Sequence, residues 1–230
     1  MEAAVICAAG LSSRMGGEKK EYQKLKHDSS LTVLGSAARA FAAVKSVEII
    51  AIVIPEDEER LAREALSPDW LASSKAKILF VAGGSSRRAS VLNALSLLEA
   101  YNPEFVLIHD GARPWVSPSL IKKIIEEVKK HSAVIPMISL VETPKECAEP
   151  LSRTRAVFIK NHLKRSLVGV AQTPQGFKFP EILYAHKKAA ELESERFTDD
   201  AEIWGRFIGQ VAVIPGEKEN RKITFPEDLA

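Results

Sequence analysis

The fold of this chain is decided near its start, by the stretch Ala3-Ala4-Val5-Ile6-Cys7-Ala8-Ala9-Gly10-Leu11-Ser12-Ser13-Arg14-Met15-Gly16-Gly17-Glu18-Lys19-Lys20. Its short apolar run ends at a glycine and predicts a buried strand. The loop that follows combines flexible glycines with hydroxyl groups and with the positive charges of Arg14 and Lys20, a combination suited to binding an anion. It does not match the Walker pattern, because no Gly-Lys-Ser/Thr follows at the required spacing, and it does not match the dinucleotide fingerprint, because Ser12 stands two residues after Gly10. The stretch predicts a phosphate-binding loop at a sheet edge, with a glycine-rich surface turn as the alternative.

Strands and helices alternate through most of the remaining chain at intervals of roughly 25–30 residues. This rhythm is typical of right-handed βαβ units in a parallel sheet. We therefore predict an α/β fold, a Rossmann-like, mostly parallel sheet flanked by helices. The expected strands after the first cover 47–54, 77–82, 105–108, 133–138, 167–171 and 211–214, and the expected helices cover 30–44, 56–66, 88–100, 117 onward, 180–192 and 199–207.

Polar, glycine-containing turns follow three of the expected strands. They contain Gly10, the pair Gly83-Gly84, and His109-Asp110. Because ligands bind outside the carboxyl ends of strands in such sheets, we expect these turns to converge on one site. Their convergence favours the phosphate-binding interpretation of the first loop.

The alternation breaks at 139–160, which contains Pro144 and Pro150. Short β-type segments there, such as 156–159, predict a protruding β-arm inserted into a single domain that spans 1–230. An ordinary surface loop is the alternative. The apolar content of the segment favours an arm that packs on a partner subunit.

Composition excludes several classes of protein. The 230 residues are 46% hydrophobic, which is too many for a disordered chain. The 32 Lys and Arg residues nearly balance 30 Asp and Glu residues, so we expect no nucleic-acid partner. The two cysteines, Cys7 and Cys147, lack metal-ligand neighbours and are expected to be reduced. We see no signal peptide and no membrane span, and expect a cytoplasmic protein.

Several segments occur together in an order that resembles one family. They are Ala8-Ala9-Gly10 with Arg14-Met15-Gly16, Lys20-Glu21-Tyr22, Gly83-Gly84 with Arg87 and Ser90-Val91, His109-Asp110-Gly111-Ala112-Arg113-Pro114, Gln172-Thr173-Pro174-Gln175-Gly176-Phe177, Thr198-Asp199-Asp200-Ala201, and Asn220-Arg221-Lys222-Ile223-Thr224. From Ala3 to Asp228 the chain resembles the 2-C-methyl-D-erythritol 4-phosphate cytidylyltransferases of non-mevalonate isoprenoid synthesis. The resemblance implies transfer of CMP from CTP to a sugar-alcohol phosphate, with release of pyrophosphate. It also implies Mg²⁺, bound mainly through the CTP phosphates, with no metal ligand assigned in the protein.

The resemblance also implies the site residues. Lys20 is preferred to Lys19 because Lys20-Glu21-Tyr22 fits a family triplet, and Arg113 is expected to hold its turn. The implied catalytic residues are Arg14, Lys20, Arg165 and Lys222. The implied nucleotide-binding residues are Ala8, Ala9, Gly10, Ser12, Gly83, Ser90 and Asp110. The implied substrate-binding residues are Thr143, Arg165, Thr173, Thr198 and Lys222. In the family, the equivalents of Thr143 and Arg165 come from a neighbouring subunit, which implies a homodimer through the arm.

The chemistry agrees with these residue types. A substrate phosphate oxygen is already anionic, so the reaction needs cations that bring anions together rather than a strong base. The chain also departs from the family pattern. Ser12 replaces a glycine common in the loop, the loop is about one residue short before Lys20, and Ser85 stands where the family often has Asp. A few extra residues precede Glu142-Thr143-Pro144-Lys145.

Two alternatives remain open from the sequence. One is a ribitol-5-phosphate cytidylyltransferase, although Ala112 favours the first family. The other is a nucleotide-binding homologue without catalysis, which the retained cations argue against.

Overall fold

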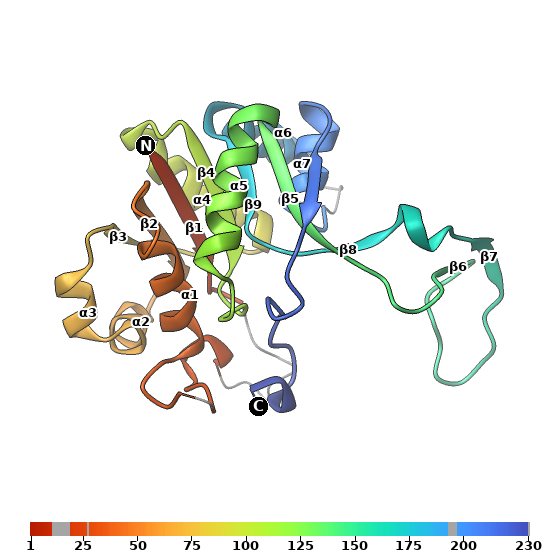
Figure 1. The fold of residues 1–230 in the computed structure, drawn as a ribbon, viewed down its shortest axis with the longest axis horizontal. Coiled ribbons are helices and arrows are strands. Elements are labelled where there is room, and N and C mark those ends of the chain that lie inside the picture. The colour runs from red at the N-terminus through yellow and green to blue at the C-terminus, as the bar shows by residue number, and fades with distance from the viewer. Residues whose placement is uncertain (11–18, 27, 193–196, 230) are drawn as a thin grey trace.

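The computed structural model describes residues 1–10, 19–26, 28–192 and 197–229. Its centre is a mixed sheet in the order β10-β5-β9-β4-β1-β2-β3, with β8 paired to β5 (Figure 1). The strands of this sheet are β1 (Glu2–Cys7), β2 (Val47–Ile54), β3 (Lys77–Ala82), β4 (Phe105–Asp110), β5 (Ala133–Ser139), β8 (Gly169–Ala171), β9 (Gln175–Lys178) and β10 (Ala212–Pro215). The predicted α/β class with a mostly parallel sheet is confirmed.

Two strands run against the others. Strand β9 lies antiparallel between β4 and β5, and β8 is antiparallel to β5. Strand β9 is absent from the sequence expectations because Gln175-Gly176-Phe177-Lys178 contains no apolar run. Gly176 allows helix α5 (Pro118–His131) to approach, since a Cβ at this position would lie 2.6 Å from Ile124 Cγ2. The sequence alone does not show that α5 packs closely enough on this strand to require a glycine.

Helices cover both faces of the sheet. They are α1 (Val33–Ala42), α2 (Glu59–Leu66), α3 (Pro68–Ser73), α4 (Arg87–Leu98), α5 (Pro118–His131), α6 (Phe179–Glu191) and α7 (Asp200–Phe207), with short 3₁₀ turns η2 (Lys20–Tyr22), η3 (Glu99–Tyr101), η4 (Arg165–Leu167) and η5 (Pro226–Leu229). Side chains alternate between the faces of a strand, so Ile50 and Ile52 pack with α1, α2 and α5. Their neighbours Ile49 and Ala51 pack with α4, α6 and α7.

Local capping signals set several helix starts. The Ser117 hydroxyl accepts a hydrogen bond from Leu120 N, and Pro118 is the first helical residue, as predicted. Helix α3 was not predicted, because its six residues offer too short a pattern to detect. Within the described residues, no helix combines the length and hydrophobicity required to cross a membrane.

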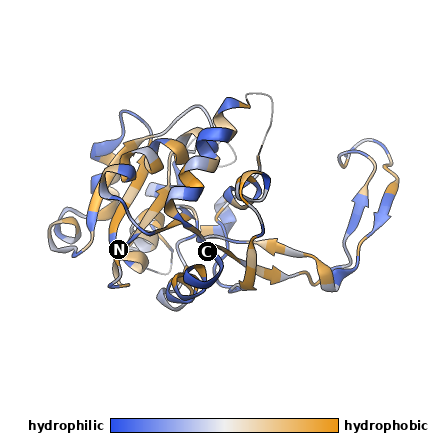
Figure 2. Ribbon diagram, turned by 90° about the horizontal axis from the view of Figure 1, so that it is seen from above, coloured by the Kyte–Doolittle hydropathy of each residue, from blue (hydrophilic) through white to orange (hydrophobic). Residues whose placement is uncertain are grey.

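An arm extends from this body between β5 and β8 (Figures 1 and 2). It carries the antiparallel pair β6 (Lys145–Cys147) and β7 (Ile159–His162). The hairpin continues past the predicted limit of 160, and the strand expected at 156–159 begins only at Ile159. The chain returns to the body through η4.

Candidate active site at the carboxyl edge of the sheet

The parallel ladder brings the predicted turns together. Cys7, the last residue of β1, pairs with Val53 on one side and Asp110 on the other. Val53 in turn pairs with Val81 near the end of β3. The segments that follow these strands, 8–10, 83–84 and 110–114, therefore lie along one edge.

Small residues let two of these segments approach each other closely. A Cβ on Gly83 would lie 2.5 Å from Ala9 Cβ, so a side chain at this position would displace the loop after β1. Gly83 N donates to Ile54 O at 2.7 Å, and the buried Ser90 hydroxyl accepts from Gly84 N at 3.0 Å. Ala8 is fully buried. These predicted nucleotide-binding positions form a compact backbone platform rather than a set of projecting side chains.

Of the two neighbouring lysines, Lys19 borders this platform. The ammonium group of Lys19 donates to Gly10 O at 2.7 Å, which brings a positive charge to the end of the β1 loop. Burial lowers the pKa of Lys19. Lys20, the preferred candidate, is largely buried in η2. The other predicted loop residues, Arg14 and Ser12, lie outside the described residues.

Asp110 is the centre of a charged cluster at the end of β4. Its Oδ2 lies 2.9 Å from Lys222 Nζ and 3.6 Å from Arg113 Nε, and its Oδ1 lies 3.5 Å from Arg87 Nε. Burial alone would raise the pKa of Asp110, but Arg87, Lys222 and Arg113 outweigh it and hold the pKa well below its usual value. The carboxylate is therefore ionised at neutral pH.

Arg87 connects this cluster to the interior. Its Nη2 lies 2.8 Å from Asp200 Oδ2, and Asp200 Oδ1 lies 3.2 Å from His186 Nε2. Arg87 and Asp200 occur within the ordered motifs of the sequence, where no role is predicted for either, and no sequence pattern indicates His186. Nothing in the sequence spacing joins these three residues, which are brought together by α4, α7 and α6.

The C-terminal segment is fixed by polar contacts, and this determines where Lys222 lies. Arg113 Nη1 donates to Asn220 O at 2.8 Å, which agrees with its expected role in holding the turn. The buried Asn220 donates through Nδ2 to Thr173 O at 2.8 Å. Gln172 Nε2 donates to Glu217 O at 2.8 Å, and Ile223 N donates to Ala112 O at 2.8 Å.

Thr173 contacts the same turn through its side-chain hydroxyl. Because His109 Nε2 lies 3.1 Å from the carbonyl oxygen of Arg113, this nitrogen carries the ring proton. The Thr173 hydroxyl therefore donates to His109 Nδ1 at 3.0 Å and accepts from Asp110 N at 3.0 Å. Burial lowers the pKa of His109 to about 4, so the ring is neutral. The predicted substrate-binding Thr173 lies beside Asp110, with its hydroxyl proton committed to His109.

Three predicted substrate residues lie apart from this cluster. Thr143 and Arg165 are exposed in the arm, where Arg165 Nη1 donates to Val141 O at 2.7 Å. Thr198 precedes α7, and its hydroxyl donates to Glu202 Oε2 at 2.7 Å. Within one chain, the structure thus brings Lys222, Asp110 and Thr173 together but leaves the arm residues remote (Figure 1).

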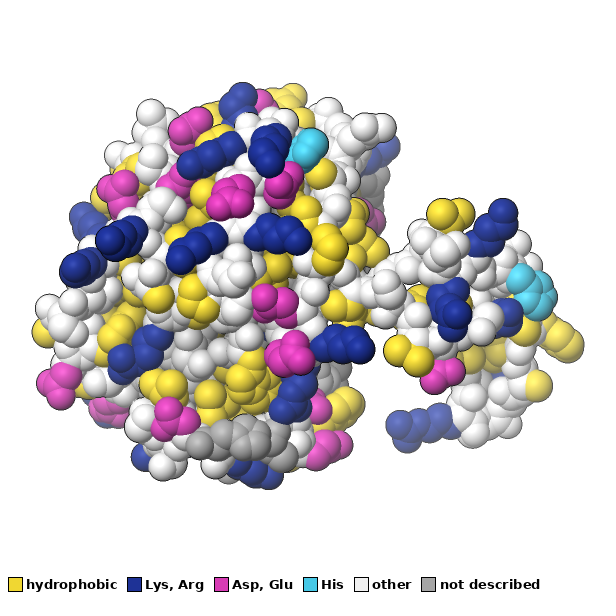
Figure 3. Space-filling model, viewed as in Figure 1, with side chains coloured by type: hydrophobic (Ala, Val, Ile, Leu, Met, Phe, Trp, Pro, Cys, Tyr) yellow, Lys and Arg dark blue, Asp and Glu magenta, His cyan; other side chains and the backbone are white. Residues whose placement is uncertain are grey.

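One face of the protein shows how its surface charges are distributed (Figure 3). On the face in Figure 3, Lys and Arg are interspersed with Asp and Glu over the body and form no continuous basic patch.

No group of three or more His, Cys, Asp and Glu residues that could hold a metal ion occurs among the described residues.

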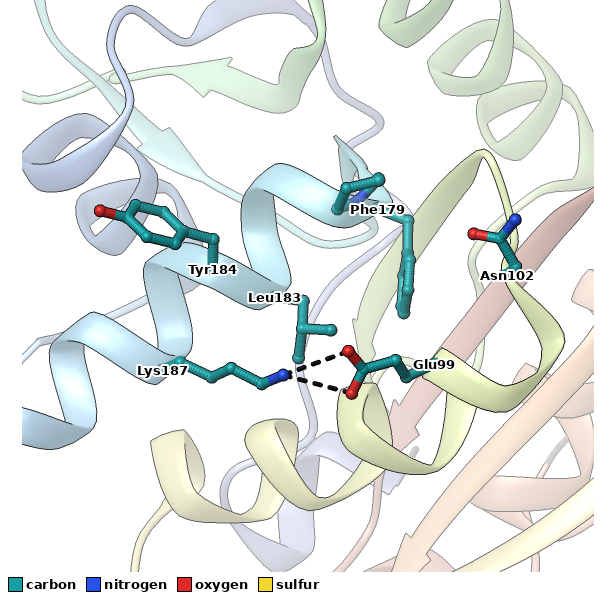
Figure 4. Close-up of a pocket in the computed structure, with 7 residues that line it drawn as sticks. Glu99, Asn102, Phe179, Leu183, Tyr184 and Lys187 are labelled. Atoms are coloured by element: carbon teal, nitrogen blue, oxygen red, sulfur yellow. Dashed lines mark hydrogen bonds and ion pairs between the residues drawn. The ribbon is translucent and has the colours of Figure 1, made fainter.

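A separate cavity of about 300 Å³ lies at the other edge of the sheet, near the start of β4 and α6. Figure 4 shows Lys187 bonded to both carboxylate oxygens of Glu99 beside Phe179. This cavity is remote from Asp110 and contains none of the predicted site residues.

The family model described as IspD, 2-C-methyl-D-erythritol 4-phosphate cytidylyltransferase, matches residues 2–230. The chain belongs to this family. The resemblance inferred from the ordered motifs is confirmed.

Individual relatives agree. The chain is 34% identical over 227 residues to the bifunctional enzyme IspD/IspF of Bartonella henselae, a match that covers 99% of this chain and 54% of that protein. The corresponding protein of Wolbachia pipientis wMel is 35% identical over 230 residues, with 99% and 53% covered. The chain thus spans about half the length of the curated relatives it matches.

Solved structures extend the likeness to the fold. The 4-diphosphocytidyl-2C-methyl-D-erythritol synthase of Anaerococcus prevotii is 29% identical, with a TM-score of 0.78 and 99% of this chain and 94% of that chain covered. The 2-C-methyl-D-erythritol 4-phosphate cytidylyltransferase of Thermus thermophilus is 27% identical, with a TM-score of 0.73 and 98% and 94% covered.

Proposed function

We propose that this chain transfers CMP from CTP to 2-C-methyl-D-erythritol 4-phosphate and releases pyrophosphate. The observation that carries the proposal is the family match over residues 2–230. The cationic cluster around Asp110, at the carboxyl edge of the sheet where the sequence predicts the site, supports it.

The reaction joins two anions. A phosphate oxygen of the acceptor attacks the α-phosphorus of CTP and forms a new P–O bond. The bond from the α-phosphorus to the oxygen that bridges to the β-phosphate breaks, and its electron pair leaves with pyrophosphate. No proton has to be removed from the attacking oxygen, so positioning and charge neutralisation supply most of the catalysis.

The nucleotide is assigned to the backbone platform formed by 8–10 and 83–84. There the exposed main chain of Gly10 is open to a base or ribose, and Asp110 lies at the adjacent strand end. Arg14 and Lys20 are assigned to the triphosphate. Lys19, already at Gly10 O, is the second lysine within reach of this end of the loop.

The acceptor phosphate is assigned to Lys222, whose side chain is 39% exposed and whose ammonium group is a point charge 2.9 Å from Asp110 Oδ2. Thr198 and Thr173 are assigned to the acceptor on the basis of the family resemblance alone. Mg²⁺ prefers carboxylate and phosphate oxygens. Both oxygens of Asp110 already lie beside Lys222, Arg113 or Arg87, so the phosphate oxygens of CTP would supply most of the ligands of the ion. When bound, the ion would neutralise charge on the reacting phosphates.

The remaining assignment requires a second subunit. Thr143 and Arg165 are remote from Lys222 in their own chain, and the arm exposes Leu151, Phe158 and Leu167 by about four-fifths of their surface each. Exposed apolar side chains on a protruding segment are typical of an interface. We infer a homodimer in which the arm of one subunit brings Arg165 to the Lys222 edge of the other, where its guanidinium can bind a phosphate through two hydrogen bonds.

Pyrophosphate release tests the proposal. CTP, UTP, ATP and GTP are each supplied with 2-C-methyl-D-erythritol 4-phosphate or with ribitol 5-phosphate, with Mg²⁺ present. We expect release only with CTP and the methylerythritol phosphate. Faster turnover with ribitol 5-phosphate would assign the sister reaction, and binding of CTP without release from any pair would indicate a homologue that lacks catalysis.

A further inference from the structure

Four side chains form a continuous polar row that leads from the site into the protein interior. The Asp110 row consists of Asp110 on β4, Arg87 on α4, Asp200 on α7 and His186 on α6. Its successive separations are 3.5, 2.8 and 3.2 Å. Only its outer end is open to solvent, since Arg87 is 32% exposed and Asp110 13%, whereas Asp200 and His186 are fully buried.

The inner end of the Asp110 row is poorly explained by stability alone. A buried carboxylate has a large desolvation cost that its partner cation at best offsets, and apolar residues of similar volume are often as stable or more so. The helices that carry Asp200 and His186, α7 and α6, contribute apolar residues such as Trp204 and Ile182 to the core cluster on this face. We therefore expect the buried carboxylate of Asp200 to act mainly by fixing the position of the Arg87 side chain that it contacts.

That geometry is rigid at Arg87. A guanidinium is planar with donors at fixed angles, so contacts with Asp200 through Nη2 and with Asp110 through Nε restrict the whole group. The shorter contact, to Asp200, lies on the buried side. Asp200 is the first residue of α7, and its other carboxylate oxygen, Oδ1, lies 3.2 Å from His186 Nε2. The interior therefore determines where Arg87 stands, and Arg87 in turn faces the carboxylate at the site.

We propose that Asp200 and His186 are positioning residues for nucleotidyl transfer, which fix the Arg87 guanidinium so that it orients the Asp110 carboxylate beside Lys222. This proposal rests on the proposed function and adds residues to its site. Neither residue touches a reacting atom, and both act through Arg87. A displacement of about 1 Å at a reacting centre is enough to cost on the order of a hundredfold in rate.

A neighbouring pair of identical substitutions tests the proposal. Asp200→Asn removes the charge that holds Arg87. Asp199→Asn makes the same change one residue earlier, where the carboxylate caps α7 and contacts Gln175 but not the Asp110 row. We expect Asp200→Asn to lower kcat/KM for CTP by roughly tenfold to a hundredfold. Asp199→Asn should stay within about twofold, because Asn also caps helices well.

A double-mutant cycle separates positioning from general loss of structure. If Asp200 acts through Asp110, adding Asp200→Asn to an Asp110→Asn variant should change kcat/KM by less than about twofold. An equal loss in both backgrounds, or no loss in either, overturns the proposal. Arg87→Lys keeps the charge but cannot make both contacts, so it should reproduce most of the effect. It also serves as the second variant if Asp200→Asn does not fold.

An NMR measurement keeps this result separate from the proposed function. The Nε–H resonance of Arg87 should move or broaden in Asp200→Asn and in His186→Gln, and should be unchanged in Asp199→Asn. An unmoved Arg87 resonance in both variants overturns the positioning role. A wild-type chain that releases no pyrophosphate overturns the proposed function instead, and the Arg87 resonance then decides alone whether Asp200 positions this group.

Discussion

The sheet edge and the arm hold their functional side chains in opposite ways. At the edge, Asp110 has three cationic neighbours, and Thr173 is bonded to the Asp110 backbone and to His109. In the arm, Arg165 donates to the Val141 carbonyl and Thr143 is exposed. The edge has its geometry fixed within one chain, whereas the arm displays side chains whose surroundings its own chain does not supply.

This difference has an energetic basis. A side chain pinned by buried bonds has already lost its rotamer entropy on folding, while an exposed arginine loses up to about 2 kcal/mol of that entropy only when something binds it. The edge is therefore preorganised for charge stabilisation. In the proposed dimer, the exposed side chains of the arm would lose this entropy only when the second subunit covers them.

The largest expected effect comes from removing one cation at the edge. Lys20→Ala should lower kcat by roughly 10²–10³, the scale for loss of one charge-stabilising donor. Steady-state pyrophosphate release measures this, with Lys24→Ala as a lysine control beyond η2. Turnover close to wild type would exclude Lys20 from the reaction and leave Lys19 as the candidate.

Mixing two inactive variants tests whether edge and arm act across subunits. The Lys20→Ala variant lacks a cation at the edge, and the Arg165→Ala variant lacks one in the arm. Each variant alone should be nearly inactive. Random re-association gives half heterodimers with one intact site each, so about one quarter of wild-type activity should return, as expected for an isologous dimer. The variants are mixed after unfolding and refolded together. If activity does not return although heterodimers form, the arm serves its own chain.

Acid should weaken the edge more than the arm. Arg87 and His186 overcome the effect of burial and hold the pKa of Asp200 at about 2, below the usual value near 3.9. The resulting stability is present above about pH 4 and is lost as the pH falls toward 2, and amounts to roughly 2–3 kcal/mol.

Urea unfolding at several pH values measures this contribution. The free energy of unfolding of Asp200→Asn should fall less steeply between pH 4 and 2 than that of the wild type. In the arm, Glu149 forms an exposed pair with Arg155, and Glu149→Gln should leave the slope unchanged within the small value typical of surface pairs. Equal slopes for Asp200→Asn and wild type would contradict the assignment.

A matched pair of threonine substitutions gives the smallest contrast. Thr173→Val leaves Asp110 N and His109 Nδ1 without their buried partner and should lower the free energy of unfolding by roughly 1–3 kcal/mol. Thr143→Val, at an exposed position in the arm, should stay within about 0.5 kcal/mol. Denaturant titration of both variants checks this. Equal losses would mean that the arm is packed as tightly as the edge.

Much of the fold follows from local sequence. The strands predicted at 47–54 and 77–82 match β2 and β3 at both ends, because β-branched runs bounded by proline or glycine report their limits directly. The start of α5 was equally local, since Ser117 and Pro118 act within one turn. The edge that gathers Gly10, Gly83 and Asp110 followed from parallel topology alone.

Part of the candidate site needed the tertiary structure. The predicted roles of Arg165 and Lys222 came from motif resemblance, and only the folded chain reveals that one lies in the arm and the other beside Asp110. Arg14 and Ser12 remain predictions outside the described residues. Thr198 was found bonded to Glu202, a local contact that its spacing of four could have suggested.

The sequence by itself thus determined the alternation of strands and helices, the start of α5 and the edge at which chemistry gathers, because each depends on residues that are neighbours along the chain. The helices predicted from 30 and from 56 begin instead at Val33 and Glu59. The tertiary structure decided the rest: the insertion of β9 between β4 and β5, the path of the arm, and the Asp110 row. Arg87 and Asp200 are separated by more than a hundred residues. No periodicity spans that distance, and only the packing of α4, α6 and α7 on one face of the sheet brings their charges into contact.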